Sequence, residues 1–279
     1  ISQSEKKLFV LGRNSSLEEF VGNLHLLAFT QAHLGVVRGG PAERRAFLDR
    51  AMVTLYPGHV ACLAAYGRAL KQRNSILASA RDGRAGIEDA LVDSWDEAVI
   101  QPGARIVYNR RRYVDEMKRE LPQGLFDDEI LKVHYWSSIG GDAAEVPLLE
   151  EDFRRRLWKA RESDRRNGYT SVGPHRDDLK LYVNGKSLTD FGSAGQQRSG
   201  LLALYFAQME IHRKLHGFYP VFLVDDAEAE LDRERLNTFL DYLSQRTQTF
   251  LTSAKGFLLE AMAHGAAHFE ICNGAVRPL

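Results

Sequence analysis

The chain has 279 residues, of which 44% are hydrophobic and 27% charged, a composition typical of a globular protein with a sizeable core. Lysine plus arginine and aspartate plus glutamate number 37 each, so any nucleic-acid contact must come from local clusters rather than from net charge. The sequence has neither a signal-peptide pattern nor a run of about 18 apolar residues, which excludes the ordinary transmembrane helix.

Apolar runs of strand length occupy residues 8–11 and 24–29 near the start of the chain. We expect residues 1–37 to form part of a sheet-containing lobe. From residue 38 the apolar residues recur at helical spacing, and residues 38–168 are expected to form a mainly helical insertion. Its predicted helices span residues 42–56, 59–80, 87–100, 105–121 and 149–166, with a strand at 130–137. Gln101-Pro102-Gly103 is expected to separate the third helix from the fourth.

Residues 169–279 are predicted to return to alternating strands and helices. Strands are expected at 169–172, 221–224, 249–252 and 269–272, and helices at 194–216, 233–243 and 255–264. Asn184-Gly185 lies between two short apolar runs and suits the type I′ turn of a hairpin. Gly217 is placed to end the helix that begins after Ser193. The predicted fold class is therefore α/β at both ends, with a helical lobe inserted between them.

Two adjacent carboxylates, Asp225 and Asp226, follow the apolar run at residues 221–224. The carboxyl end of a buried strand is where ligands bind in open α/β sheets. In a nucleotidase the first carboxylate would hold Mg²⁺ and the second would orient or deprotonate the attacking water. Taken alone, however, an Asp-Asp pair more often simply ends a strand in a solvated loop.

The segment Phe191-Gly192-Ser193-Ala194-Gly195-Gln196-Gln197-Arg198 precedes an apolar helix. Small residues allow a ligand to approach the backbone closely, and a helix N-terminus offers free N–H groups and a positive dipole to a phosphate. Ser193 could contact that phosphate directly. An N-cap serine after a glycine-rich turn explains the same segment equally well without a ligand.

Together these motifs resemble the RecF family of bacterial recombination-repair ATPases, which belong to the SMC/ABC class. The resemblance covers essentially the whole chain. It depends on R-G-G-P-A-E-R-R-A-F-L-D at 38–49, Y-G-R-A-L-K-Q-R-N at 66–74, G-P-H-R-D-D-L at 173–179, S-A-G-Q-Q-R at 193–198 and L-V-D-D-A-E-A-E-L-D at 223–232. It implies an ABC/SMC-type ATPase head lobe with an inserted helical lobe, and ATP with Mg²⁺ as cofactors.

The resemblance also implies roles for individual residues. Ser193, Gly195 and Gln196 would belong to the signature motif, which contacts the nucleotide of a second protomer. Asp225 would be the Walker B metal ligand and Asp226 the catalytic carboxylate.

Two further positions follow from the same resemblance. Asp232 would lie in the D-loop at the dimer interface. Thr252 stands where many ABC ATPases carry a switch histidine, so no imidazole is present there to sense the γ-phosphate.

Gln31 is expected at the exit from the nucleotide lobe, where a Q-loop glutamine would reach metal or water. The chain departs from the family here, because Phe29-Thr30-Gln31-Ala32-His33-Leu34 replaces the usual Phe-x-Pro-Glu-Asp-Leu. A surface turn is an equally good explanation of Gln31. His175 and Arg176 are candidates for an active-site or interface role, and a structural His–Asp or Arg–Asp network explains them at least as well.

No Walker A loop is found in these residues. The one Gly-Lys-Ser, at 185–187, lies in the predicted hairpin, and Lys180 occupies the position that the motif G-x-x-x-x-G-K-[S/T] reserves for glycine. RecF-like chains carry this loop near the N-terminus, and the present chain opens on Ile1. We therefore expect a fragment that lacks the Walker A portion and that does not turn over ATP alone.

Charge clusters modestly favour a nucleic-acid partner. Residues 38–84 hold nine basic against three acidic residues and residues 154–166 seven against two, whereas residues 225–234 hold six acidic against one basic. A solvated helix face is the ordinary explanation of any one basic run. With the resemblance included, we expect the basic insertion to contact double-stranded DNA.

The sequence thus predicts an ATP-dependent clamp that dimerises on gap or junction DNA in recombinational repair, with RecR and RecO as partners. Cys62 and Cys272 have no partners at metal-ligand spacing, which favours a reducing, cytoplasmic location. Two alternatives remain open at this point: a Mg²⁺-dependent DNA nuclease that uses Asp225 and Asp226, and a non-catalytic scaffold for DNA or a partner.

Overall fold

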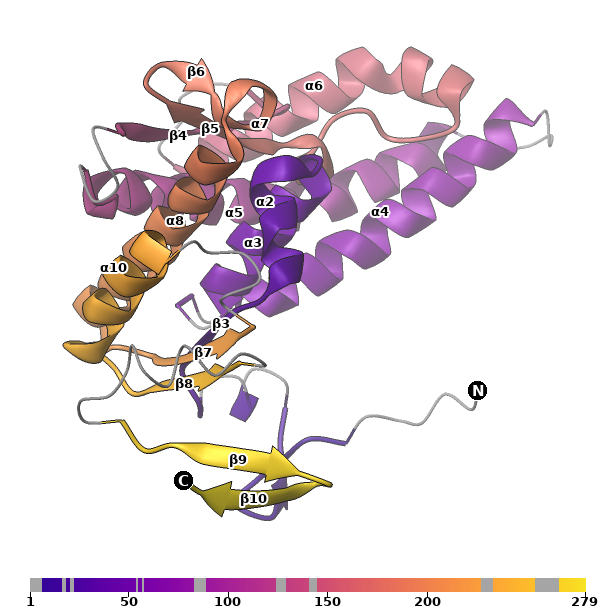
Figure 1. Ribbon diagram of the computed structural model, residues 1–279. Coiled ribbons are helices and arrows are strands. Elements are labelled where there is room, and N and C mark those ends of the chain that lie inside the picture. Colours follow the sequence, from indigo (N-terminus) through magenta and orange to yellow (C-terminus); the bar gives the residue numbers. More distant parts are fainter. Residues whose placement is uncertain are drawn as a thin grey trace. The chain divides into compact units, whose positions relative to one another are not determined.

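Figure 1 shows the computed structural model of the chain. It describes residues 7–16, 19–20, 23–53, 55–56, 58–82, 89–123, 129–140, 145–226, 233–253 and 266–279. The chain divides into two compact units: Ile1–His25 with Leu34–Phe218, and Leu26–His33 with Tyr219–Leu279. Each unit is built from two separate stretches of the chain, and residues 169–218 lie in the first unit. The predicted division into lobes at residues 37 and 168 stays a prediction.

Helices dominate the first unit: α2 (Gly35–Arg38), α3 (Pro41–Val53), α4 (His59–Arg81), α5 (Asp89–Glu120), α6 (Val146–Asn167), α7 (Leu188–Phe191) and α8 (Ala194–His216). Helices α4, α5 and α6 pack around one core, to which Tyr66, Val99, Phe153 and Leu157 contribute. Pro41 begins α3, a position that proline tolerates because the first-turn N–H has no partner within the helix. No described helix has the length and apolarity to cross a membrane.

Helix α5 is continuous through Pro102, so the prediction of two helices is wrong. An interior proline loses one backbone hydrogen bond and costs about 3 kcal/mol. Burial of apolar residues before and after Pro102 offsets this cost. The buried residues are Val99, Ile100, Ala104, Ile106 and Val107. Gly103 does not serve a turn: a Cβ there would lie 2.6 Å from Phe153 Cε1 and 3.1 Å from Tyr66 Cε2. The glycine therefore lets α4 and α6 approach α5 closely.

An antiparallel sheet, in the order β4-β5-β6, completes most of the first unit. Its strands are β4 (Leu131–Trp136), β5 (Asp178–Val183) and β6 (Lys186–Ser187). Asn184 and Gly185 form the predicted hairpin turn, with φ of 48° and 80°. A short pair, β1 (Phe9–Val10) and β2 (Arg13–Asn14), lies near the N-terminus.

The strand expected at residues 169–172 is not formed. The backbone of this segment forms hydrogen bonds with side chains instead of with a neighbouring strand. Asn74 Oδ1 accepts hydrogen bonds from the Thr170 backbone N–H at 2.8 Å and from its hydroxyl at 2.6 Å. Asp164 Oδ1 likewise accepts from the backbone N–H of Ser171 at 3.0 Å.

The second unit contains a parallel sheet in the order β3-β7-β8 (Figure 1). Its strands are β3 (Leu26–Phe29), β7 (Val221–Asp225) and β8 (Thr249–Thr252), and α10 (Arg233–Ser244) connects the last two. Phe239 of α10 lies 5.7 Å from Phe29 and 5.6 Å from Phe222 between ring centroids, which anchors the helix to the sheet. Strands β9 (Phe269–Cys272) and β10 (Ala275–Pro278) form a hairpin. The helix predicted at 255–264 lies outside the described residues.

Candidate functional site

The carboxyl edge of the parallel sheet carries the two predicted carboxylates. Asp225 is the last residue of β7, and its register partner on β8 is Thr252. The Thr252 hydroxyl donates to Asp225 Oδ1 at 2.6 Å and accepts from the backbone N–H of Asp226 at 3.2 Å. Asp226 has a φ of 53°, a left-handed conformation that turns the chain away from the strand direction. One hydroxyl therefore orients both residues.

This edge has the donors that a magnesium ion requires. Mg²⁺ prefers carboxylate oxygens and keeps several waters, and both Asp225 and Asp226 are exposed at the end of the central strand. Among the described residues, no ion pair involves either carboxylate. The residues present thus fit a hydrated metal ion, with Thr252 orienting the ligand rather than holding the ion.

The sequence singled out Thr252 as the switch position, and that assignment stays a prediction. It noted the missing imidazole and did not anticipate the hydroxyl that orients Asp225. The sequence places Asp225 and Thr252 near the ends of two strands. Their pairing depends on the register between β7 and β8, which the sequence does not reveal.

Gln31 begins the short 3₁₀ helix Gln31–Leu34, two residues beyond the end of β3. Phe29 is the register partner of Val224, so the backbone of Gln31 leaves the sheet at the edge that carries Asp225. The side chain of Gln31 is not among the described groups, and Asp232 lies outside the described residues. The Q-loop and D-loop assignments remain predictions.

Ser193 is the N-cap of α8 and takes part in a complete capping box. Its hydroxyl accepts from the Gln196 backbone N–H at 3.1 Å, and the Gln196 side chain accepts from the Ser193 backbone N–H at 3.0 Å. The Ser193 side chain is exposed, and its O–H can still donate to a ligand. Gln197 accepts from Arg38 Nε at 3.0 Å, which holds the first turn of α8 against α2. The start of α8 is therefore held in place by local hydrogen bonds, including one to the Gln196 side chain. Its assignment as a signature motif stays a prediction.

His175 and Arg176 lie in the short 3₁₀ helix Pro174–Arg176 of the first unit. His175 Nδ1 is 2.6 Å from the Tyr66 hydroxyl, and Nε2 is 3.0 Å from the Thr170 carbonyl oxygen. The Arg176 guanidinium donates to the same carbonyl and lies over the Tyr169 ring. Both side chains bind the protein's own backbone and aromatic rings.

The next two residues of this motif, the buried Asp177 and the partly buried Asp178, hold it in place through their carboxylates. Asp177 accepts from the Tyr135 hydroxyl and from the Ser138 backbone N–H, the latter at 2.8 Å, and burial raises its pKa above the ordinary value. Asp178 accepts two hydrogen bonds from Arg44, at 2.7 and 3.1 Å. The sequence indicated the motif but not these partners, which lie far away along the chain.

A second buried network joins three helices. Arg73 of α4 donates to Asp96 of α5 at 2.6 Å and to Asp164 of α6 at 2.9 Å. Arg73 and Asp164 are fully buried. Breaking such a pair leaves an uncompensated buried charge and costs about 3–5 kcal/mol. The network identifies part of the 66–74 motif as structural.

The parallel sheet, the helical lobe and the exposed carboxylates at the sheet edge define the class of protein. The chain has the fold of an ABC/SMC-type ATPase head with an inserted helical lobe. The structure titled "Structure of the recombination mediator protein RecF-ATPrS in RecFOR pathway" superposes with a TM-score of 0.85 at 29% identity, covering 96% of this chain and 71% of that chain. A structure of RecF-ATP in the same pathway gives 0.84 at 28% identity.

Sequence comparison gives the family. The chain is 35% identical over 271 residues to the DNA replication and repair protein RecF of Halothermothrix orenii, covering 93% of this chain and 71% of that protein. It is also 35% identical over 279 residues to RecF of Desulforudis audaxviator, covering 99% and 75%. No family model matches the chain. The chain belongs to the RecF family, and the resemblance inferred from its motifs is confirmed.

Proposed function

We propose that the protein is an ATP-dependent DNA-binding clamp of recombinational DNA repair. The observation that carries this proposal is the exposed Asp225–Asp226 pair at the carboxyl edge of the sheet, oriented by Thr252. Support comes from RecF relatives whose structures are described with ATP and in the RecFOR pathway. From that name we infer RecO and RecR as partners. We further propose gap or junction DNA as the substrate and the cytoplasm as the location.

Each residue at the edge has a distinct part in the proposed hydrolysis. Asp225 would hold Mg²⁺, directly or through water, while the Thr252 hydroxyl fixes the orientation of its carboxylate. Asp226 would hold the attacking water and accept its proton. When bound, the metal supplies charge neutralisation at the phosphate oxygens. Gln31 would reach metal or water from the end of β3.

Ser193, Gly195 and Gln196 are proposed to act on the nucleotide of a second protomer. The Ser193 O–H would donate to the γ-phosphate while its oxygen continues to cap α8. Because this contact exists only with ATP bound, it would favour a closed head-to-head dimer on duplex DNA, and hydrolysis would release it. Asp232 would lie at the same interface.

The first test concerns hydrolysis. The 279 residues contain no G-x-x-x-x-G-K-[S/T], so we expect this chain alone to show no ATP turnover in a phosphate-release assay. Joined to a Walker A segment, the protein should hydrolyse ATP, and Asp226→Asn should lower kcat by about 10²–10⁴-fold, the usual contribution of a general base. Asp241→Asn, on the exposed face of α10, is the matched control.

Three results would contradict the assignment. ATP turnover by the chain alone that disappears in Asp226→Asn would show that no external P-loop is needed. An unchanged kcat in the Asp226 variant of the joined protein would remove the carboxylate from the chemistry. Metal-dependent DNA strand cleavage without ATP would indicate a nuclease instead.

The second test concerns dimerisation. Ser193→Arg should abolish ATP-induced dimerisation in light scattering, but it also removes a helix cap that is worth about 1 kcal/mol. Ser193→Asp keeps a good N-cap and places a negative charge toward the phosphate, so it should abolish dimerisation while leaving the melting temperature nearly unchanged. Ser187→Ala removes the N-cap of α7 and should leave dimerisation intact. Normal dimerisation of both Ser193 variants would refute the signature role.

A further inference from the structure

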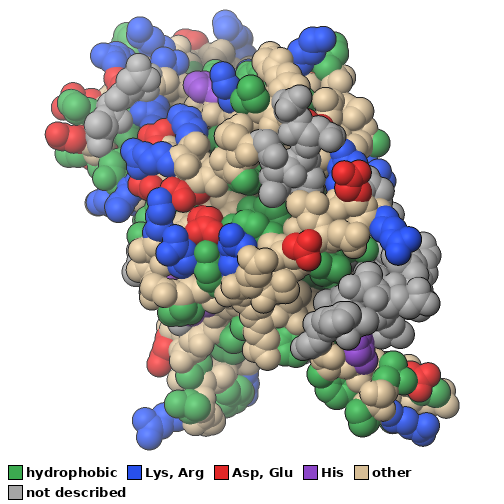
Figure 2. Space-filling view, turned by 60° about the vertical axis from the view of Figure 1, so that its left-hand side comes forward, with side chains coloured by type: hydrophobic (Ala, Val, Ile, Leu, Met, Phe, Trp, Pro, Cys, Tyr) green, Lys and Arg blue, Asp and Glu red, His purple; other side chains and the backbone are tan. Residues whose placement is uncertain are grey.

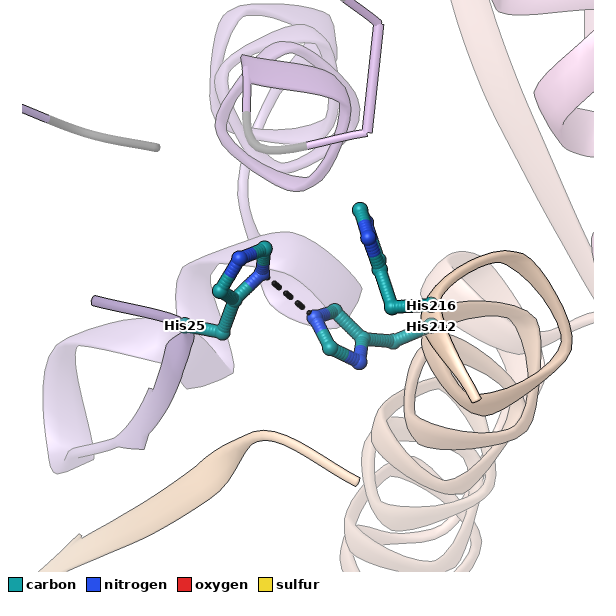
Figure 3. A group of neighbouring side chains, drawn as sticks. All are labelled: His25, His212 and His216. Atoms are coloured by element: carbon teal, nitrogen blue, oxygen red, sulfur yellow. Dashed lines mark hydrogen bonds between the residues drawn. The ribbon is translucent and has the colours of Figure 1, made fainter. Parts of the chain in front are cut away.

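Three histidines gather at the C-terminal end of α8 (Figure 3). His212 and His216 are at positions i and i+4 of the helix and therefore lie on one face of it. His25, which immediately precedes β3, faces them from another part of the chain. Each imidazole offers one ring nitrogen, and these three nitrogens lie within 4.8 Å of one another. All three residues belong to the first compact unit.

The hydrogen bonds of the cluster determine which nitrogens carry protons. His212 Nδ1 is 2.9 Å from the carbonyl oxygen of Phe218, and a carbonyl can only accept, so this nitrogen is the donor. His212 Nε2 then has its lone pair directed at His25 Nδ1, 2.7 Å away. A ring nitrogen that donates to a backbone carbonyl while the other faces the ligand position is the usual arrangement of metal-bound histidine.

One aromatic ring packs against two of the three histidines. Phe218 lies edge-on to His25 and His212, at centroid distances of 5.2 and 5.3 Å. His212 is buried and His216 is exposed, so an ion could reach the cluster from solvent at the His216 ring.

The ring arrangement is compatible with coordination. The ring centroids lie 4.8 Å apart for His25 and His212, 4.6 Å for His25 and His216, and 4.5 Å for His212 and His216. With Zn–N bonds of about 2.0–2.1 Å, tetrahedral ligands stand about 3.4 Å from one another. The His25–His212 pair would have to open by less than about 1 Å to admit an ion.

We propose that His25, His212 and His216 form a binding site for one divalent transition-metal ion, with Zn²⁺ the best match. Three imidazoles suit zinc, copper or nickel, whereas Mg²⁺ and Ca²⁺ require oxygen ligands. Water would complete a tetrahedral shell. The site would tie the segment that leads into β3 to the end of α8. It uses none of the residues proposed to act on ATP.

The test uses tag-free protein stripped of metal with a chelator. Calorimetric titration with Zn²⁺ should show one ion per chain, and Co²⁺ should give the intense visible absorption of a tetrahedral site. Zinc should also raise the melting temperature. His216→Ala and, separately, His25→Ala should weaken Zn²⁺ binding at least tenfold, which corresponds to about 1.4 kcal/mol. His134→Ala, exposed on β4, should bind as the parent protein does.

Any of the following results would refute the proposed metal site. Absence of binding in the calorimeter would leave a histidine cluster held only by hydrogen bonds. Binding that survives both His25→Ala and His216→Ala would place the ion elsewhere, and loss of binding in His134→Ala would do the same. Circular dichroism of each variant checks that it folds. The two ligand variants lie on separate segments, so a folding defect in one leaves the other decisive.

Discussion

The His175 ring uses both of its nitrogens in the neutral state. The Thr170 carbonyl can only accept, so Nε2 carries the proton, and Nδ1 accepts from the Tyr66 hydroxyl at 2.6 Å. Burial, with a smaller contribution from the nearby Arg176, Arg45 and Arg73, lowers the pKa of His175 to about 4. A second proton on this ring would break the bond from Tyr66 and place a charge beside three guanidinium groups.

This geometry predicts a pH dependence of stability. Because the pKa of His175 is lower in the folded chain than the ordinary 6.5, the unfolded chain binds the proton more readily. The contribution is complete above about pH 6.5 and is lost as the pH falls toward 4, by up to roughly 3 kcal/mol. Urea unfolding between pH 7 and 4 should show a flatter stability curve for His175→Gln than for the parent. The exposed His134→Gln should keep the parent's slope, and an equal slope in all three proteins would contradict the prediction.

At the scale of elements, Gly103 allows α4 and α6 to pack closely against α5. Replacing glycine by alanine should therefore have opposite effects on stability at Gly103 of α5 and at Gly67 of α4. Gly103→Ala would place a Cβ against Phe153 and Tyr66 and should destabilise the protein by about 1–3 kcal/mol through overpacking. Gly67→Ala, on α4 where a Cβ meets no atom within 4 Å, should stabilise it by about 0.5–1 kcal/mol. Thermal melts compare the two variants, and a neutral or stabilising Gly103→Ala would refute the packing role.

Local signals predicted some elements well. The N-cap at Ser193 and the Asn184-Gly185 turn depend only on residues that are close together in the sequence. Pro102 shows the limit of such signals. Its local preference for a break is overcome by burial of α5 along its length, and burial is a property of the assembled core.

At the scale of the whole molecule, opposite charges lie close together. Figure 2 shows a face on which Lys and Arg side chains lie among Asp and Glu side chains. The basic run of α6 follows this pattern. Arg154 donates to Glu97 of α5 at 2.8 and 2.9 Å, and Arg155 pairs with Asp152. Part of the positive charge of α6 is therefore already neutralised by ion pairs within the protein.

If α6 contacts DNA, the exposed Lys159 and Arg166 are the residues to test. Replacing both with alanine should weaken binding to duplex DNA similarly for all sequences. It should also reduce the slope of log K against log salt by about 0.9 for each phosphate that the variant no longer neutralises. Lys180→Ala, exposed on β5, is the control. An unchanged affinity and slope in the double variant would exclude this face of α6 as the DNA-binding surface.

The sequence by itself determined the family, the fold class and the elements that carry the motifs, because these depend on residue order and short-range periodicity. Only the tertiary structure placed Thr252 beside Asp225, Arg73 between Asp96 and Asp164, and His25 beside His212. These partners are distant along the chain, and strand register and helix packing decide which of them meet. Coordination, hydrogen bonding and charge pairing act over a few ångströms, so the chemistry of each site depends on that packing.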